Sequence, residues 1–154
     1  MTDEIKSLSN TQIDTFFKTD TKYGGCFDKD FIINKPDRKF YIINMDKANQ
    51  SGTHWTLVSM LNPSVGVYVD SEGEIPPMIV QQYMKRRRKH NFFNTKQFQS
   101  LNSDTCGYFC CYVGDQLSKG IDVKSIIDKF TTIVENEKFI RDWSINVGLN
   151  RELM

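Results

Sequence analysis

Cys106 is the residue of this sequence whose surroundings best suit a nucleophile. A thiol attacks as its thiolate, and the N-terminus of a helix and a nearby imidazolium both favour that ionised form. The nearly apolar stretch that starts at Cys106 predicts a helix buried on most sides, with Asp104 or Thr105 placed to cap its first turn. Gly107 adds no side chain, so we expect a substrate backbone to approach there. These residues together predict covalent catalysis by a thiol.

The base for such a thiol must be one of the 2 histidines, His54 or His90. His90 ends a basic run, whereas His54 opens a segment with strand character, so His54 is the better candidate. The Asn-Pro-Ser turn at 62–64 predicts that this strand pairs antiparallel with the next one, which closes at Asp70. Antiparallel pairing places His54 and Asp70 at the same end of the hairpin, where the carboxylate can orient the imidazole.

Further polar residues compete for the remaining roles. Glu72 lies two residues after Asp70 and is an alternative for orienting the histidine. Gln99 precedes the cysteine across a polar turn, so its amide can reach the same pocket and bind an oxyanion. Gln97 has the same chemistry, but its spacing fits less well. The predicted catalytic set is therefore His54, Asp70, Gln99 and Cys106.

The order of these residues resembles that of the adenovirus maturation protease and its relatives, the SUMO-processing proteases. The shared features are the pair His54-Trp55, an acidic residue after a strand at Asp70, then Gln99 and the pair Cys106-Gly107. The stretch QSLNSDTCGYFCCYV is similar to the viral branch in its Gln-to-Cys spacing and its Cys-Cys run, and YGGCFDKDF resembles that branch's N-terminal loop. The resemblance covers roughly residues 16–113.

The resemblance implies a cysteine endopeptidase with a papain-like core in permuted order. Its triad would be His54, Asp70 and Cys106, and its oxyanion site would combine Gln99 with the Cys106 backbone amide. Trp55 would pack near the site and Gly107 beside it, with Gly24, Gly25 and Cys26 in a loop on the substrate side. For Cys26, a buried structural thiol is an equal alternative.

The resemblance also implies a DNA virus or virus-like element as the source. Substrates in that family are capsid or core precursors cut next to small residues, often at Gly-Gly or Gly-x, so the expected location is the virion and the infected host cell. An alternative within enzymes is an isopeptidase that removes ubiquitin-like proteins, although the short chain and the CGYFCC segment count against it. Another alternative is an inactive module that binds Gly-Gly tails, against which the complete catalytic set argues.

A run of basic residues, Lys85, Arg86, Arg87, Arg88 and Lys89, allows three interpretations. Most simply it is a solvated helix end, where positive charge complements the helix dipole. The resemblance implies DNA as an activator, bound through phosphates in a salt-dependent way. The absence of interleaved aromatic residues and a net charge of only +1 weigh against DNA, and a nuclear address is the third interpretation. The chemistry itself is expected to need no cofactor and no metal.

The composition of the 154 residues, 39% hydrophobic and 25% charged, predicts one domain over residues 1–154. No signal peptide is recognisable, and no apolar run approaches the ~18 residues of a membrane span. We therefore expect a soluble intracellular monomer without membrane contact. In a reducing compartment the 4 cysteines should be thiols, the more so because Cys110 and Cys111 are adjacent and do not pair easily.

The elements that must position the site predict an α+β fold. We expect a small, mainly antiparallel sheet packed on the central helix that starts at Cys106, with further helices around it. Periodicity and capping predict helices over 9–18, 78–90 and 106–117, and one or two more from Asp122 onward. Strand patterns cover 31–34, 39–45, 54–61, 65–70 and 91–99.

Overall fold

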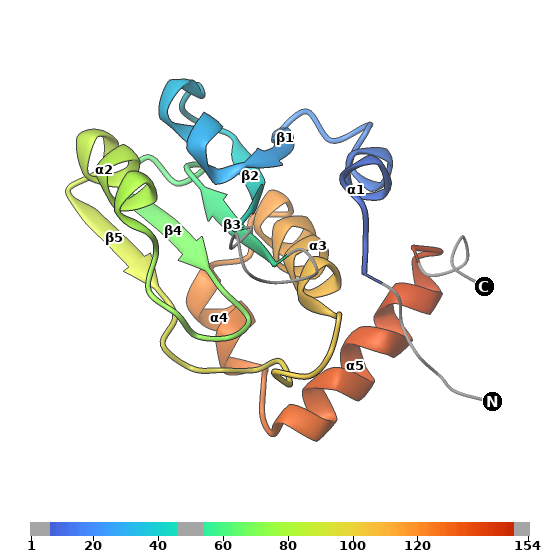
Figure 1. Ribbon diagram of the computed structural model, residues 1–154. Helices are drawn as coiled ribbons and strands as arrows, with labels where there is room; N and C mark the ends of the chain where they lie inside the picture. The colour runs from blue at the N-terminus through green and yellow to red at the C-terminus, as the bar shows by residue number, and fades with distance from the viewer. Residues whose placement is uncertain (1–6, 46–53, 150–154) are drawn as a thin grey trace.

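A five-stranded sheet in the order β1-β2-β3-β4-β5 runs through the middle of the protein (Figure 1). The computed structural model describes residues 7–45 and 54–149. The strands are β1 (Tyr23–Asp28), β2 (Phe40–Asn44), β3 (Trp55–Ser59), β4 (Val65–Val69) and β5 (His90–Phe93). β2, β3 and β4 pair antiparallel as expected, whereas β1 joins β2 and β5 joins β4 in parallel. The α+β class is confirmed, with a sheet that is antiparallel in its middle and parallel at both edges.

One face of the sheet is covered by the 3-10 helix η1 (Lys29–Asn34) and by α2 (Met78–Arg87). Side chains alternate along a strand, so every second residue of β2, β3 and β4 points to this face. The buried cluster on this side consists of Ile32, Tyr41, Ile43, Val58, Met60, Tyr68, Val80, Tyr83 and Met84. α2 also explains the parallel edge, because a crossover helix between β4 and β5 returns the chain in the same direction.

The opposite face is covered by α3 (Cys106–Ser118), which lies between the sheet and α5 (Ile133–Asn146) in Figure 1. α1 (Asn10–Phe16) and α4 (Val123–Asp128) complete this layer. Residues 106–114 of α3 are all buried, which confirms the prediction of a buried central helix. No helix in the described ranges 7–45 and 54–149 has the length and apolar character needed to cross a membrane.

In the first third of the chain, the positions of one helix and one strand differ from those expected. The predicted strand at 31–34 is wrong, since these residues belong to η1, while the strand lies earlier, at β1. The Asp28 side chain accepts a hydrogen bond from the Asp30 N–H at 3.0 Å and so starts a helical turn. Gly24 allows β1 to lie against the Tyr41 ring, because a Cβ at this position would come within 2.1 Å of that ring.

The predicted strand over 91–99 is also only partly right, because β5 ends at Phe93 and the following residues are irregular. Asn94 holds this segment to the end of β4: its Oδ1 accepts from the Asp70 N–H at 2.9 Å, and its Nδ2 donates to the Asp70 carbonyl at 2.6 Å. The N–H groups of Phe98 and Gln99 both donate to the Ser71 carbonyl. These bonds replace a strand ladder and bring Gln99 to the predicted site.

The predicted helix over 78–90 ends earlier, at Arg87, and the next residue of the basic run is part of the core. Arg88 has a side chain only 4% exposed and forms two hydrogen bonds with the Asp37 carboxylate, at 2.6 and 2.9 Å. It also donates to the carbonyls of Met60 and Asn62, each at 2.9 Å. Hydrogen bonding from Arg88 holds the pKa of Asp37 below its usual value. Arg88 thus joins the end of α2 to two loops of the sheet.

Arg88→Gln is expected to lower the free energy of unfolding by about 2–3 kcal/mol, because buried carbonyls and a carboxylate lose their donor. Urea denaturation followed by circular dichroism would measure this change. Arg86→Gln is the matched control, since Arg86 is an exposed member of the same run and should change stability by less than about 0.5 kcal/mol. Equal effects of the two substitutions would contradict the structural role of Arg88.

Candidate active site

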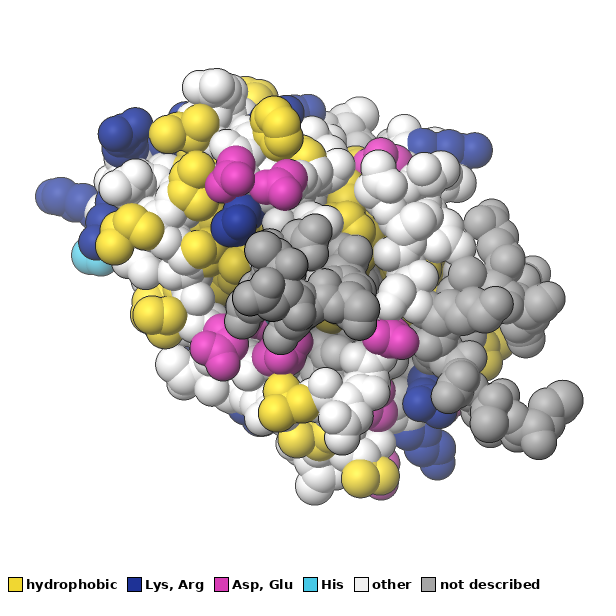
Figure 2. Space-filling view, in the orientation of Figure 1, with side chains coloured by type: hydrophobic (Ala, Val, Ile, Leu, Met, Phe, Trp, Pro, Cys, Tyr) yellow, Lys and Arg dark blue, Asp and Glu magenta, His cyan; other side chains and the backbone are white. Residues whose placement is uncertain are grey.

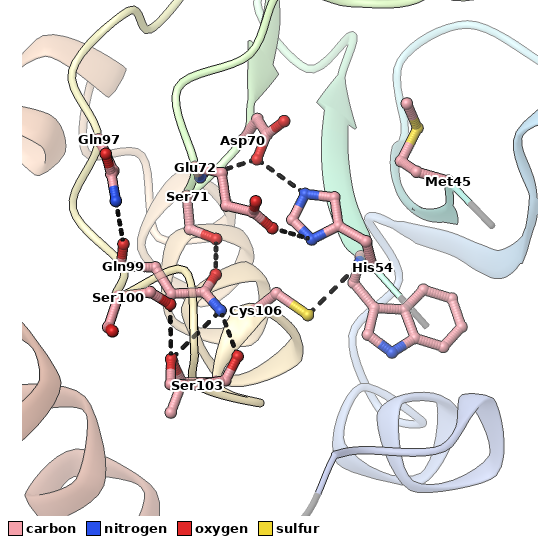
Figure 3. A network of polar contacts seen from close by, with 12 residues as sticks. Met45, His54, Asp70, Ser71, Glu72, Gln97, Gln99, Ser100, Ser103 and Cys106 are labelled. Atoms are coloured by element: carbon pink, nitrogen blue, oxygen red, sulfur yellow. Dashed lines mark hydrogen bonds and ion pairs between the residues drawn. The ribbon is translucent and has the colours of Figure 1, made fainter. Parts of the chain in front are cut away.

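Cys106 is the first residue of α3 and lies against the start of β3 (Figure 3). The Trp55 backbone N–H points at its sulfur, with N and Sγ 3.4 Å apart. His54 immediately precedes β3 and lies close enough to Cys106 for the thiol to raise the pKa of its imidazole. The close packing of α3 on β3 therefore brings together two residues that are far apart in the sequence.

His54 lies between two carboxylates (Figure 3). Its Nε2 is 2.9 Å from Asp70 Oδ1, and its Nδ1 is 2.8 Å from Glu72 Oε2. The antiparallel hairpin does place His54 and Asp70 at the same end, as the turn signal predicts. Glu72, considered only as a substitute for Asp70, is instead a second partner of the same ring. A ring that donates to both carboxylates must carry both protons, so this geometry describes an imidazolium.

Asp70 is buried, with 2% of its side chain exposed, and is held by its neighbours. Its Oδ1 also accepts from the Glu72 N–H at 2.8 Å, which turns the chain so that the Glu72 side chain comes back toward His54. Asn94 fixes the Asp70 backbone from the other side. No local sequence pattern indicates Asn94, because its contact joins residues 24 positions apart.

Burial lowers the pKa of His54, but the interactions of its imidazole with Asp70 and Cys106 outweigh burial and raise the pKa to about 10. Burial raises the pKa of the Cys26 thiol to about 12 and the pKa values of the Cys110 and Cys111 thiols well above their usual value. These three thiols stay protonated at neutral pH. All four cysteines lie in the described part of the chain, and none is in a disulfide, as expected.

Gln99 is buried beside Cys106, and its amide is fully oriented (Figure 3). Its Oε1 accepts from the Ser71 hydroxyl, and its Nε2 donates to the Ser103 carbonyl at 3.0 Å and lies 3.3 Å from Ser103 Oγ. Gln97 donates to the Gln99 carbonyl at 2.9 Å and lies behind it. The structure therefore places Gln99, and not Gln97, next to the thiol, and adds Ser71 and Ser103 as partners that spacing alone did not indicate.

One expectation about the start of α3 needs correction, and a second residue there has a further role. The Thr105 side chain makes no capping bond to the helix, because its hydroxyl is turned toward Glu137 of α5. Gly107 is a packing requirement, because a Cβ there would lie 3.1 Å from both Leu8 and Trp55. The sequence had assigned this glycine to substrate approach, which stays a prediction.

A cavity of about 300 Å³ lies on the β1 side of Trp55. Cys26 and Trp55, both expected on the substrate side, line it together with Leu8, Ser9, Asn10, Phe27, Asp28 and Asn44. Trp55 Nε1 donates to the Leu8 carbonyl at 3.0 Å, so the segment before α1 forms one wall. Gly24 and Gly25 belong to the same strand but do not line this cavity; Gly25 has a φ of 129°, a conformation that favours glycine.

Comparison with known proteins identifies the fold. No protein-family model matches the sequence, and no curated protein matches it. The ASFV pS273R protease matches with a TM-score of 0.65 at 17% identity, over 88% of this chain and 66% of that chain. The SUMO protease Ulp1 matches with 0.51 at 20% identity, over 93% and 79%, and ChlaDub1 from Chlamydia trachomatis with 0.54 at 13% identity, over 97% and 83%.

These likenesses confirm the predicted fold: the chain has the SUMO-protease type of papain-like fold. It spans about two thirds of the length of the ASFV protease chain. At such low identity the comparisons show the fold alone, and the chemistry of the site follows from its own geometry.

The raised pKa of His54 determines in which direction its contribution to stability changes with pH. In the unfolded chain the imidazole titrates near ~6.5, so the stability gained from its charged form is fully present below that pH. This contribution is lost as the pH rises toward about 10, where the folded form titrates. Ring ¹⁵N chemical shifts should show that titration, and Asp70→Asn should lower the His54 pKa by about 1–3 because an opposite charge is removed. A His90→Gln variant assigns the signals, and an ordinary His54 pKa in the wild type would contradict the ion pair.

Proposed function

We propose that this protein is a cysteine endopeptidase with Cys106 as nucleophile, His54 as its acid–base partner and Asp70 as the residue that orients His54. The observation that carries the proposal is that Asp70 pairs with His54 at 2.9 Å and that His54 lies beside Cys106, which is at the N-terminus of a buried helix (Figure 3). A charged imidazole beside the sulfur favours the thiolate, and the helix dipole acts in the same direction. The other three cysteines lack this environment.

The reaction follows from these positions. The Cys106 thiolate attacks the peptide carbonyl carbon, so a C–S bond forms and the carbonyl oxygen becomes an oxyanion. Gln99 and the Cys106 backbone amide are the proposed donors to that oxyanion. The His54 imidazolium gives its proton to the leaving amine as the C–N bond breaks, which leaves a thioester. Neutral His54 then takes a proton from water, whose oxygen releases the acyl group and restores the thiolate.

The Glu72 contact bears on this cycle because it occupies His54 Nδ1 in the described structure. Asp70 already takes Nε2, so proton transfer to a leaving amine requires Nδ1 to be released from Glu72. Glu72 is partly exposed, with 29% of its side chain accessible, whereas Asp70 is buried. Glu72 can therefore move away when a substrate arrives, while Asp70 stays in place to orient the ring.

The proposed substrates are viral capsid or core precursors cut next to small residues, within the virion or the infected cell. Support comes from the sequence resemblance to the adenovirus maturation protease and from the likeness of the fold to a protease of ASFV, also a virus. The cavity beside Trp55 and Cys26 is of a size to receive a few residues of an extended peptide.

The second candidate is an isopeptidase that removes ubiquitin-like proteins. It is favoured by the likeness to Ulp1, which is a SUMO protease, over 93% of this chain. The two activities share the thiol chemistry and differ in the substrate surface. Cleavage of ubiquitin-like fusions without cleavage of precursor peptides would select the isopeptidase, and the reverse would select the endopeptidase.

DNA is proposed as an activator that binds the basic run. Lys and Arg side chains gather at the left edge of Figure 2, over α2 and β5, beside a histidine. Of the run, Lys85, Arg86 and Lys89 are exposed. Arg88 is buried, and Arg87 stacks on the Tyr83 ring at 3.8 Å from its centroid. The proposal therefore depends on three exposed cations, which lie apart from the thiol.

Labelling with a peptide vinyl ester that ends in Gly-Gly tests the nucleophile. The wild type should gain one adduct by intact mass, at Cys106, and Cys106→Ala should gain none. Cys26→Ala is the matched control, because Cys26 is partly exposed while the other three described cysteines are buried, and its loss should leave the adduct in place. Equal labelling of wild type and Cys106→Ala would refute the protease assignment and leave an inactive binding module.

Substitution of Lys85, Arg86 and Lys89 by Gln tests the DNA contact. Binding to a labelled duplex should weaken, and the slope of log K against log salt should become shallower by roughly 2–3, since each lost phosphate contact removes about 0.9. The control replaces three exposed lysines on the opposite layer, Lys124, Lys129 and Lys138, by Gln. Equal losses in both triple variants would show that no specific DNA surface exists on α2 and β5.

A further inference from the structure

Glu137 on α5 lies against the loop that joins Gln99 to Cys106. The Ser100 N–H donates to its Oε2 at 3.0 Å, and the Ser103 hydroxyl donates to the same oxygen at 2.9 Å. The Thr105 hydroxyl lies 2.9 Å from Oε2 and 3.1 Å from Oε1. Three groups from both ends and the middle of one loop thus converge on a single carboxylate.

The same loop holds the two proposed oxyanion donors. The Ser103 carbonyl accepts a hydrogen bond from Gln99 Nε2 at 3.0 Å (Figure 3). Thr105 is the residue directly before Cys106, so its position sets where the backbone enters α3. Because Glu137 holds both Ser103 and Thr105, it fixes the amide of Gln99 and the start of the helix relative to each other.

The loop has few other anchors. Leu101 is 66% exposed, and Asn102 and Asp104 are exposed as well, so no apolar side chain of residues 100–104 is buried in the core. Its conformation therefore depends on polar contacts. A carboxylate suits this task because its two oxygens accept several hydrogen bonds at once, and bonds to a charged acceptor are the stronger kind.

We propose that Glu137 is a positioning residue for the oxyanion site, acting through Ser103 and Thr105. This inference rests on the proposed function, since it assigns Glu137 a role in thiol-dependent peptide hydrolysis. Loss of its charge should misplace the oxyanion donors while leaving the Cys106, His54 and Asp70 contacts in place. The structure separates the two sets: Asp70 and His54 are held by the hairpin and Asn94, whereas the hydrogen bonds of Glu137 within the described residues go to the loop at 100–105.

Two reactions of Cys106 separate these effects. Alkylation by iodoacetamide needs the thiolate but creates no oxyanion, whereas a peptide aldehyde forms a hemithioacetal whose oxygen occupies the oxyanion site. In Glu137→Gln, the rate of alkylation should stay that of the wild type. Affinity for a Gly-Gly aldehyde and kcat for a Gly-Gly peptide substrate should each fall by about tenfold, with KM little changed.

Glu135→Gln is the matched control, because Glu135 is an exposed residue two positions earlier on α5 and carries the same charge. It should behave as the wild type in both reactions. Thr105→Val removes one donor from the same network, so its loss of aldehyde affinity should not add fully to that of Glu137→Gln in the double variant. Additive losses would show that Glu137 does not act through Thr105 and would overturn the proposed route.

The outcomes distinguish this inference from the proposed function. A wild type that forms no aldehyde adduct at Cys106 overturns the protease assignment and the role of Glu137 with it. A wild type that forms the adduct, with Glu137→Gln equal to it, overturns the positioning role alone. A parallel loss of alkylation and aldehyde binding in Glu137→Gln would show a general structural effect and would also overturn it.

Discussion

The close contact between α3 and the sheet is the constraint on which the rest of the structure depends. Two glycines on one face of α3 make it possible: a Cβ at Gly107 would lie 3.1 Å from Trp55, and one at Gly114 would lie 2.7 Å from Phe40. The spacing of seven residues returns to the same side of a helix after two turns, so both glycines face β2 and β3. This short separation brings the first residue of α3, Cys106, to the start of β3, where the Trp55 N–H lies 3.4 Å from its sulfur and His54 precedes the strand.

Polar residues around this contact are arranged to keep charge inside a largely apolar core. A buried carboxylate is costly unless it is paired and hydrogen-bonded, and the Asp70 carboxylate meets both conditions through His54 and the Glu72 N–H. The same interactions keep His54 charged at neutral pH. Stability and the proposed chemistry therefore depend on the same bonds: the ion pair that stabilises the fold also favours the thiolate.

The basic run contains two kinds of side chain: some contact the core of the protein and others are exposed at the surface. Arg87 and Arg88 serve the core, one on an aromatic ring and one on Asp37 and two carbonyls, while their neighbours remain exposed. A run of like charges in a sequence is thus a poor guide to surface potential. Successive side chains along α2, and those just after it, point in different directions. The planar guanidinium group of an arginine satisfies several buried acceptors, whereas a lysine could satisfy fewer.

The sequence by itself determined the parts of this protein that depend on local patterns. The turn at 62–64 with flanking alternation predicted the hairpin that joins His54 to Asp70, and the apolar stretch after Thr105 predicted the buried helix. Tertiary structure decided the rest: the η1 helix in place of a strand, the parallel edges, the packing role of Gly107, and the contacts of Glu72, Asn94 and Glu137. Turns and periodicity are set by neighbouring residues, whereas a hydrogen bond such as that from Ser100 to Glu137, 37 positions apart, exists only once distant elements have packed.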